Sequence, residues 1–496
     1  KSDNAARIVG TRARRIEDPA LLRGAGRYLD DLSLEGVLYA AFLRSPHAHA
    51  SFKVTDVAAA HAIKGVKLIL TADDLKELGD VPCLAPLGND DGSQNLVAHI
   101  PVLAKGVVKH VGDAVAFVVA ETMNAAKEAA EAIEIDFKIL PQVSDLRDAV
   151  KKGAPSVWAE QKDNIAFEQN LGDKAKVDGI FAKADKVVKL EIENNRLITN
   201  YMETRGAVGE YDAKTKSFKL TVSSQGVHGL RDVLAEQIMK VKPAQVHVMT
   251  GDVGGGFGTK TFMYREYPLV LEAARRLKRP VKWIADRADH FLGDAHGRDN
   301  ITIAEAAMDK SGKFLAMRFD VLGNLGAYAS QFGPYIHYLC ASMVTGVYRT
   351  PHIAVRLRTA YTNTIPVDAY RGAGRPEAAY TLERLVDFAA REMGMKPEAI
   401  RRKNFILPSA MPYKTPVGDR TYDTGHFDQH LTQAMASADW NGFKDRLKVS
   451  RKNGKLRGIG LATYIECTAW GDGEDVAVQL EADGTATVFS GTQSNG

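Results

Sequence analysis

The sequence predicts an α+β protein that contains more than one domain. Its 496 residues exceed the size of one ordinary domain, so two to four domains are expected. Apolar residues make up 45% and charged residues 25%, which is typical of a globular chain. Short patterns of alternating apolar residues, typical of strands, recur along the chain, and several precede segments of helix-forming residues.

Charge and cysteine usage narrow the class of protein. The net charge of +4 is small and gives no reason to expect a nucleic-acid partner. Cys83, Cys340 and Cys467 lie far apart, so they form neither a CxxC metal site nor the ligand set of an iron–sulfur cluster. Sparse cysteines favour a reducing compartment. No apolar run is long enough to cross a membrane, and a cytoplasmic location is therefore predicted.

Residues 1–150 are predicted to form a compact α/β domain. The apolar run Ala114–Ala120 is typical of a buried strand. Thr122 is suited to cap a following alanine-rich helix over 123–132, because its side-chain oxygen can accept a bond from a backbone N–H of the first turn. Residues 133–137 alternate as a further strand, which completes a strand–helix–strand unit.

His47 and His49 raise the question of a metal site in this first domain. Two histidines separated by one residue share a face of a strand. Pro46 disturbs that strand and no third ligand lies nearby in the sequence, so structural histidines are the favoured interpretation.

The strongest functional signal is a glycine-rich loop, Gly251-Asp-Val-Gly-Gly-Gly-Phe-Gly-Thr-Lys260. Four of the five residues from 254 to 258 are glycine, which no helix or strand tolerates well. A predicted strand precedes the loop and a predicted helix, Glu266–Leu277, follows it. This arrangement can bring backbone N–H groups to an anion or a polar cofactor. The spacing matches neither a P-loop nor the dinucleotide fingerprint. A simple tight turn is the structural alternative.

Other candidate residues lie outside this loop. Gln225 follows a predicted strand, and its amide can both donate and accept hydrogen bonds. Arg371 begins a second loop with glycines on both sides of Ala373, and a guanidinium pairs with anions bidentately. Glu203 and Arg205 share a face of an extended segment, and a weak surface ion pair is the structural alternative to a role at the functional site.

Four motifs in order carry a family resemblance. They are Arg27-Tyr-Leu-Asp-Asp31 with Leu43-Arg-Ser-Pro-His-Ala-His-Ala50, then Val222-Ser-Ser-Gln225, then Asp252-Val-Gly-Gly-Gly-Phe-Gly258, and finally Ala369-Tyr-Arg-Gly-Ala-Gly-Arg-Pro-Glu377. The chain resembles, over nearly its whole length, the pterin-binding large subunit of the xanthine dehydrogenase and aldehyde oxidase family of molybdenum hydroxylases.

The resemblance implies a domain order. Residues 1–150 correspond to the family's hammerhead-type α/β domain, 151–175 to a linker, and 176–425 to a first molybdopterin-binding α+β domain. Residues 426–496 correspond to the start of a second such domain, which is incomplete in this chain, so either a continuation or a companion chain would complete it. Residues 491–496 stand where the family opens a second cofactor loop.

The resemblance also implies roles for individual residues. Gln225, as the matching glutamine, would hydrogen-bond an oxygen on molybdenum, and Arg371 would border the substrate. The remaining cofactor contacts would be made by the two loops, through Gly254, Gly255, Gly256, Phe257, Gly258, Tyr370 and Gly372. No glutamate stands in the context of the family's general base: Glu466 and Glu474 are not assigned that role.

The implied activity is the oxidation of an aldehyde or an N-heterocyclic aromatic carbon, with oxygen taken from water. The cofactor would be molybdenum–molybdopterin in its cytosine dinucleotide form, with 2Fe-2S and FAD cofactors on partner subunits. The carbon-monoxide-oxidising branch has a cysteine in the arginine loop, and this chain has none there, so that branch is not expected. Two alternatives are a non-catalytic or chaperone-like subunit that holds the pterin, and an unrelated transferase that binds a phosphate compound.

Overall fold

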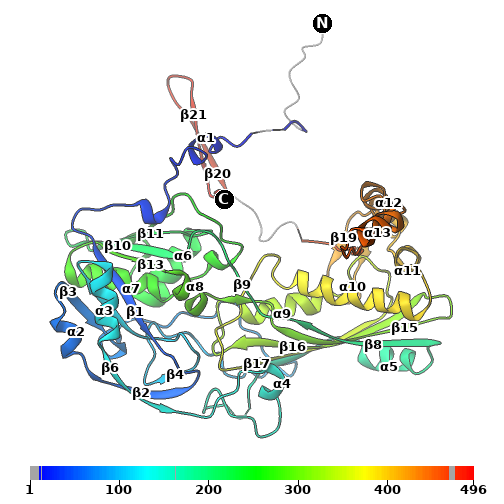
Figure 1. Cartoon of the computed structure of the whole chain (residues 1–496), viewed down its shortest axis with the longest axis horizontal. Helices are drawn as coiled ribbons and strands as arrows, with labels where there is room; N and C mark the ends of the chain where they lie inside the picture. Colours follow the sequence, from blue (N-terminus) through cyan, green and yellow to red (C-terminus); the bar gives the residue numbers. More distant parts are fainter. Residues whose placement is uncertain (1–9, 13, 162, 468–474) are drawn as a thin grey trace.

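The computed structural model describes residues 10–12, 14–161, 163–467 and 475–496. Most of them form two bodies that lie side by side, each built around its own β-sheet (Figure 1). Together they confirm the predicted α+β class.

The first body contains a seven-stranded mixed sheet. In spatial order its strands are β12 (Val246–Met249), β11 (Ser217–Val222), β10 (Gly206–Asp212), β13 (Val281–Ile284), β1 (Leu38–Arg44), β5 (Ala114–Ala120) and β3 (Val66–Leu70). Because side chains alternate along a strand, its two faces pack on different helices. On β5, Phe117 and Val119 join the core that includes α7 (Glu266–Leu277), whereas Ala116 and Val118 pack with α3 (Met123–Glu131).

The second body contains a five-stranded sheet. Its strands, in spatial order, are β7 (Ile165–Gly172), β17 (Ile353–Tyr361), β16 (Phe314–Gly326), β15 (Asn300–Met308) and β8 (Lys186–Asn194). The long helix α10 (Arg375–Glu392) and α9 (Gly333–Ser342) cover one face, and α5 (Lys174–Phe181) and α4 (Leu146–Ala149) lie on the other (Figure 1).

Smaller elements complete the structure. A three-stranded sheet consists of β4 (Val107–Val108), β2 (Ala50–Asp56) and β6 (Glu134–Ile139). The short strand pairs are β9 (Leu197–Ile198) with β14 (His296–Gly297), and β18 (Tyr413–Lys414) with β19 (Thr421–Tyr422). The remaining helices are α1 (Asp18–Leu21), α2 (Ala58–Ala62), α6 (His228–Asp232), α8 (Arg287–Gly293), α11 (Pro397–Asn404), α12 (Phe427–Ser437) and α13 (Phe443–Lys452). Single helical turns are η1 (Leu29–Asp31), η2 (Ala72–Leu75), η4 (Pro243–Gln245), η5 (Thr259–Thr261) and η6 (Pro408–Ala410), and η3 (Val233–Met239) is a π-helix.

Several local predictions are confirmed. The strand over Ala114–Ala120 and the helix over Glu266–Leu277 have the predicted bounds. Thr122 caps α3, because its hydroxyl oxygen accepts a hydrogen bond from the Ala125 N–H at 3.1 Å. His49 has its Nδ1 2.6 Å from the Pro141 carbonyl oxygen, and the ring of His47 packs on Phe137, so both histidines are part of the local packing.

The segment 151–175, which the sequence predicts to be a linker, contains a strand. The strand β7 lies inside this segment and pairs antiparallel with β17, from Ala360↔Ile165 to Ala354↔Gly172. The first predicted domain is also not a separate sheet: Leu38 of β1 pairs with Val281 of β13, which joins the N-terminal strands to strands of the next domain. The boundary between the two sheets therefore does not coincide with the predicted boundary between the first and second domains.

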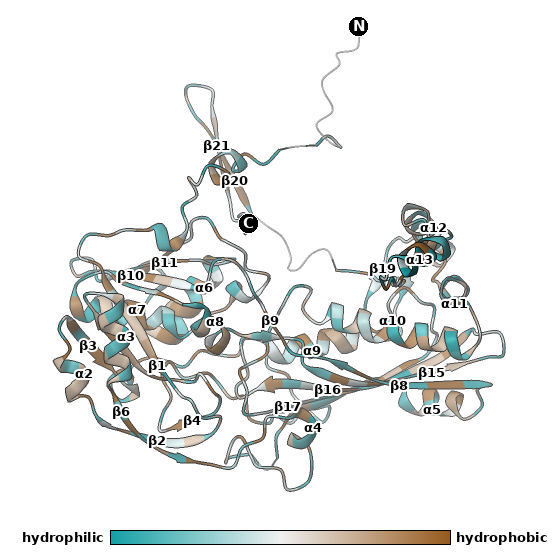
Figure 2. Ribbon diagram, viewed as in Figure 1, coloured by the Kyte–Doolittle hydropathy of each residue, from teal (hydrophilic) through white to brown (hydrophobic). Residues whose placement is uncertain are grey.

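Near the end of the chain, β20 (Val476–Leu480) and β21 (Ala486–Ser490) form an antiparallel hairpin. It stands outside both bodies, and all of its residues are exposed, including the apolar ones that appear brown in Figure 2. Among the described parts of the chain, no helix combines the length and apolar character needed to span a membrane.

Candidate functional site

The glycine loop connects β12 to α7 by a path that only glycine allows at its end. Gly258 has φ +102°, a conformation that side chains rarely adopt, and a Cβ added there would lie 3.0 Å from the Ala369 carbonyl oxygen. Phe257, just before it, has φ +49° and a 44% exposed side chain. The loop is thus a close-packed turn that directs an aromatic ring outward.

Gln225 holds this loop through its side-chain oxygen. Its Oε1 accepts hydrogen bonds from the backbone N–H groups of Gly258 at 2.8 Å and Lys260 at 3.3 Å. Within the described ranges, its Nε2 has no hydrogen-bond partner. The amide therefore presents a free donor, which is the role the resemblance implies. A Cβ on Gly256 would lie 2.4 Å from the same Oε1, so this glycine makes room for Gln225 rather than for a cofactor.

The start of the glycine loop is held by two other contacts. The N–H of Gly254 donates to the Glu203 carboxylate at 2.8 Å, and that of Gly255 donates to the Asn495 carbonyl at 2.9 Å. The backbone N–H groups of Gly256 and Phe257 have no partner in the part of the chain that the structure describes. These two adjacent donors remain available to a ligand.

Glu203 and Arg205 do not form a surface ion pair with each other. The Arg205 side chain is 0% exposed, and it binds Asp294 at 2.7 Å and Glu266 at 3.2 Å. Glu203 instead pairs with Lys260 at 2.9 Å. That alternative is wrong because each charge finds a partner far along the chain, in the interior of the first body.

The arginine loop, residues 369–375, connects the segment after β17 to α10. Arg298 holds this loop by two hydrogen bonds to its backbone: Nη1 donates to the Tyr370 carbonyl at 2.8 Å and Nη2 to the Arg371 carbonyl at 2.7 Å. Its guanidinium also lies over the Tyr370 ring, 4.8 Å from the ring centre. Gly374 has φ +84°, and a Cβ there would meet the Ile336 carbonyl oxygen at 2.3 Å.

The two loops touch, although they follow strands of different sheets. The N–H of Arg371 donates to the Phe257 carbonyl at 2.9 Å, and the Arg371 guanidinium lies 5.8 Å from the centre of the Phe257 ring. This guanidinium is exposed and has no ion pair or hydrogen bond with any residue that the structure describes. The structure therefore brings together the predicted residues of both loops where the two bodies meet.

Residues 491–496 are a third segment that contacts this site. Besides the contact of Asn495 with Gly255, the side chain of Gln493 donates through Nε2 to the Ser224 carbonyl. This segment thus reaches both the glycine loop and the residue before Gln225, at the place where the resemblance implied a further cofactor loop.

Glu466 lies closer to these loops than the sequence suggested. Its carboxylate pairs with Arg375 at 2.6 Å, and Arg375 also donates to the Gly372 carbonyl at 2.7 Å. Glu474, which was set aside with it, lies outside the described residues. The sequence offered no sign of Arg298 or Glu466 at this site, because both act on backbone or on a residue distant in sequence.

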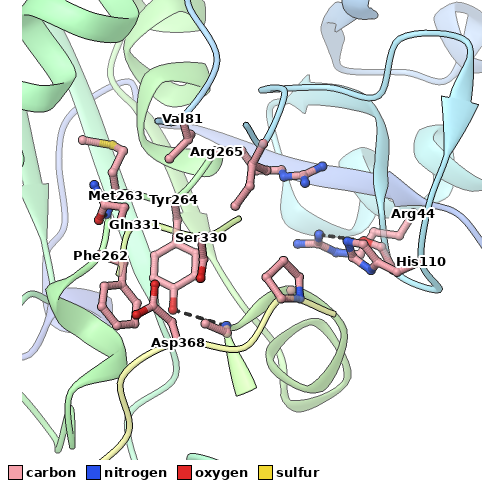
Figure 3. A pocket seen from close by; sticks show the side chains of 15 residues that line it. Arg44, Val81, His110, Phe262, Met263, Tyr264, Arg265, Ser330, Gln331 and Asp368 are labelled. Atoms are coloured by element: carbon pink, nitrogen blue, oxygen red, sulfur yellow. Dashed lines mark hydrogen bonds between the residues drawn. The ribbon is translucent and has the colours of Figure 1, made fainter. Parts of the chain in front are cut away.

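A small cavity of about 40 Å³ lies beside the segment that follows the glycine loop (Figure 3). Residues that follow the glycine loop, such as Phe262 and Tyr264, line it together with Asp368, which precedes the arginine loop. Burial raises the pKa of Asp368 to about 6, although its carboxylate accepts bonds from the backbone N–H groups of Phe332 and Ala369. The cavity has room for a few water molecules at most, which is too little for a cofactor.

The donor set of the loops fits an anionic, oxygen-rich cofactor. It consists of the N–H groups of Gly256 and Phe257, the Nε2 of Gln225 and the guanidinium of Arg371. Backbone N–H groups and guanidinium favour phosphate and other anionic oxygens. The carboxylate of Glu203 does not counteract them, because Lys260 balances its charge.

Comparisons with known proteins agree with this geometry. Residues 157–405 match the molybdopterin cofactor-binding domain, and residues 23–141 match the a/b hammerhead domain of aldehyde oxidase and xanthine dehydrogenase. The first of these ranges begins inside the predicted linker, at a point consistent with the position of β7.

Three relatives illustrate the similarity. The chain is 31% identical to the nicotine 6-hydroxylase large subunit of Paenarthrobacter nicotinovorans, over 99% of this chain and 60% of that protein. It is 31% identical to the carbon monoxide dehydrogenase large chain of Afipia carboxidovorans, over 98% of this chain and 63% of that protein. The structure of quinoline 2-oxidoreductase from Pseudomonas putida 86 superposes with a TM-score of 0.89 at 31% identity, covering 98% of this chain and 63% of that one.

The chain spans less than two thirds of the length of these relatives. Within that span, both the hammerhead match and the cofactor-domain match fall on the parts of the structure that carry the motifs. The chain belongs to the family of molybdopterin-binding large subunits that includes xanthine dehydrogenase and aldehyde oxidase.

Proposed function

We propose that this chain forms the cofactor-binding part of a molybdenum hydroxylase that oxidises an N-heterocyclic aromatic or aldehyde carbon with oxygen from water. The observation that carries the proposal is the donor set where the two loops meet, with a free Gln225 amide and a free Arg371 guanidinium on neighbouring backbones. Two of the relatives are named for nicotine and quinoline, which are both N-heterocycles.

Each residue has a separate part in this proposal. The N–H groups of Gly256 and Phe257 bind anionic oxygens of the cofactor, and Gln225 Nε2 donates to an oxygen at the reacting centre. Arg371 attracts and orients an electron-rich substrate or the cofactor's anionic end. When bound, molybdenum–molybdopterin supplies the two-electron oxidation of carbon and the transfer of an oxygen atom that originates from water.

The proposal extends to the cofactors and partners that the whole protein needs. Electrons leave through a 2Fe-2S subunit and an FAD subunit, because this chain has no cysteine cluster for such a group. The pterin is the cytosine dinucleotide form. Residues 426–496 belong to a second molybdopterin-binding domain, and the contacts of Gln493 and Asn495 with the site support this part of the proposal. The buried thiols of Cys83 and Cys340 suit a cytoplasmic location.

Carbon monoxide is not proposed as a substrate. One relative is a carbon monoxide dehydrogenase large chain, yet the arginine loop here reads Arg371-Gly-Ala-Gly-Arg375 and contains no cysteine. N-heterocycles and aldehydes are therefore preferred.

The test uses the purified assembly, a panel of aldehydes and N-heterocycles, and an artificial electron acceptor. Turnover should occur with at least one member of the panel, and product formed in ¹⁸O-labelled water should carry the label. Molybdenum-loaded assembly that oxidises nothing in the panel would favour the non-catalytic pterin-holding alternative. Protein that contains a phosphate compound and no molybdenum would favour the transferase alternative.

A further inference from the structure

A buried ion pair connects Lys260, the last residue of the glycine loop, to Glu203. The Nζ of Lys260 is 2.9 Å from Oε2 of Glu203, and the two side chains are 0% and 14% exposed. The Lys260 ammonium also faces the Tyr201 ring, 4.5 Å from its centre. Taking two charges out of water is unfavourable, and replacing a buried pair with apolar residues often leaves a protein equally stable. Stability alone is thus a weak reason for this pair.

The Glu203 carboxylate joins four separate segments of the chain. Its Oε2 accepts hydrogen bonds from the Gly254 N–H at 2.8 Å and the Ser223 hydroxyl at 2.6 Å, in addition to Lys260. Its Oε1 accepts a bond from the Leu29 N–H at 3.3 Å, which brings in the N-terminal segment. The start of the glycine loop therefore depends on the position of this one carboxylate.

Lys260 fixes the other end of the loop. Its Nζ donates to the Ser223 hydroxyl and to the Glu203 carbonyl, both at 2.8 Å. Its own backbone is bonded to Gln225 in both directions: the Gln225 N–H donates to the Lys260 carbonyl at 3.1 Å, and the Lys260 N–H donates to Gln225 Oε1 at 3.3 Å. One residue thus links Gln225 to the carboxylate that holds Gly254.

The Glu203 carboxylate accepts hydrogen bonds from Lys260, Ser223 and the backbone of Gly254 and Leu29, and the Lys260 ammonium donates to Glu203 and Ser223. Burial by itself would raise the pKa of Glu203, but the Lys260 charge and the hydrogen bonds lower it overall, so the carboxylate is ionised at neutral pH. An ionised acceptor forms stronger hydrogen bonds to backbone N–H groups than a neutral one.

We infer that the Glu203–Lys260 ion pair is a positioning device, which fixes the distance between the Gly254 end of the glycine loop and Gln225 so that the free donors of the loop meet the cofactor. This inference rests on the proposed function, because the cofactor is part of it. Neither residue touches the reacting atoms: both act through Gly254, Ser223 and Gln225.

The experiment compares Lys260→Met with a matched control, Arg401→Met, in the purified assembly. Arg401 is 0% exposed and pairs at 2.8 Å with Glu383, which is 7% exposed, among α10 and α11. Each substitution leaves one buried carboxylate without its cation, so each should destabilise the fold by a similar mechanism. The readouts are hydrogen–deuterium exchange of the peptide covering 251–260, molybdenum per chain, and the melting temperature.

Lys260→Met should raise exchange within 251–260 about tenfold or more and reduce molybdenum per chain, since an ordered loop protects its amides. Arg401→Met should lower the melting temperature without changing exchange in that peptide or the molybdenum content. Unchanged loop exchange in Lys260→Met, or an equal change in both variants, would overturn the inference.

A milder variant covers the case in which Lys260→Met does not fold. Ser223→Ala removes the hydroxyl that bonds both charges and should raise exchange within 251–260 about fivefold, the equivalent of one hydrogen bond. No increase there would contradict the inference. If the wild-type assembly holds no molybdenum, the proposed function fails, while the exchange measurement still decides whether the ion pair orders the loop.

Discussion

Side chains hold both the glycine loop and the arginine loop by hydrogen bonds to the backbone, but the side chains accept in the first loop and donate in the second. Both pass through left-handed glycine conformations, yet Glu203 and Gln225 hold the first loop by accepting bonds from its N–H groups. Arg298 holds the second by donating to its carbonyls. A carboxylate or amide oxygen accepts hydrogen bonds from backbone N–H groups. A guanidinium instead donates to carbonyl oxygens and offsets their partial negative charge.

The difference shows how a donor-rich site can be assembled from two backbones. In the glycine loop, the anchors use the outer N–H groups and leave those of Gly256 and Phe257. In the arginine loop, Arg298 occupies the carbonyls, which would repel an anion, and the Arg371 side chain remains free. The following predictions separate the two kinds of anchor.

The largest effect on stability is expected from Arg298→Met. Glu377 is 1% exposed and would lose its 3.1 Å partner, while two carbonyls lose their donor. Burial already raises the pKa of Glu377 and Arg298 opposes this, so the orphaned carboxyl is unfavourable. The free energy of unfolding should fall by about 3–5 kcal/mol.

The control for this variant is Arg318→Met, whose ion pairs with Glu305 and Asp178 are partly exposed. Its loss should lower the free energy of unfolding by less than about 1 kcal/mol. Denaturant titration of both variants measures the difference, and equal losses would show that Arg298 is no more than a surface partner.

Gly258→Ala should destabilise the contact between the two loops. The left-handed φ strains any side chain, and the new Cβ would lie 3.0 Å from the Ala369 carbonyl of the arginine loop. The expected loss of stability is about 1–3 kcal/mol. Gly226→Ala is the matched control, since nothing lies within 4 Å of its added Cβ. Thermal unfolding of the two variants should differ clearly; the same midpoint in both would mean that the loops are not in tight contact.

Gln225→Ala should lower turnover and also loosen the glycine loop, because Oε1 of Gln225 accepts hydrogen bonds from the Gly258 and Lys260 N–H groups. The same substitution removes the free Nε2 donor that we propose faces the reacting centre, and a hydrogen bond there is worth about 1–3 kcal/mol, or roughly a fivefold to 150-fold loss of kcat. The measurement is kcat with molybdenum content determined on the same sample. An unchanged rate at full molybdenum content would remove Gln225 from the site.

Arg371→Lys should have the smallest effect on stability. The guanidinium is exposed and has no ion pair or hydrogen bond in the described structure, so the free energy of unfolding should change by no more than about 0.5 kcal/mol. Lysine lacks the planar fork, and kcat/KM should therefore fall. Steady-state kinetics would show this, and kinetics identical to wild type would assign Arg371 to solvent rather than to the site.

Sequence patterns predicted the parts of the fold that are local. The Thr122 cap, the strand over Ala114–Ala120 and the helix over Glu266–Leu277 each depend on neighbours a few residues away. The strand β7 was missed because its segment is polar and its partner, β17, lies far along the chain.

The same reasoning explains which site residues the sequence revealed. Glycine spacing marked both loops, because left-handed turns leave a compositional trace. Arg298 left none, since it binds carbonyls that every residue has. The pairing of Glu203 with Lys260 across the loop was missed because proximity in sequence suggested Arg205 instead.

The measurement that tests the central claim most directly is the molybdenum content per 54.0 kDa chain in purified assemblies of wild type, Gly258→Ala and Gly226→Ala. If the two touching loops form one cofactor site, wild type and Gly226→Ala should hold about one molybdenum atom per chain, and Gly258→Ala should hold much less. Equal molybdenum in all three proteins, or none in wild type, would contradict the account.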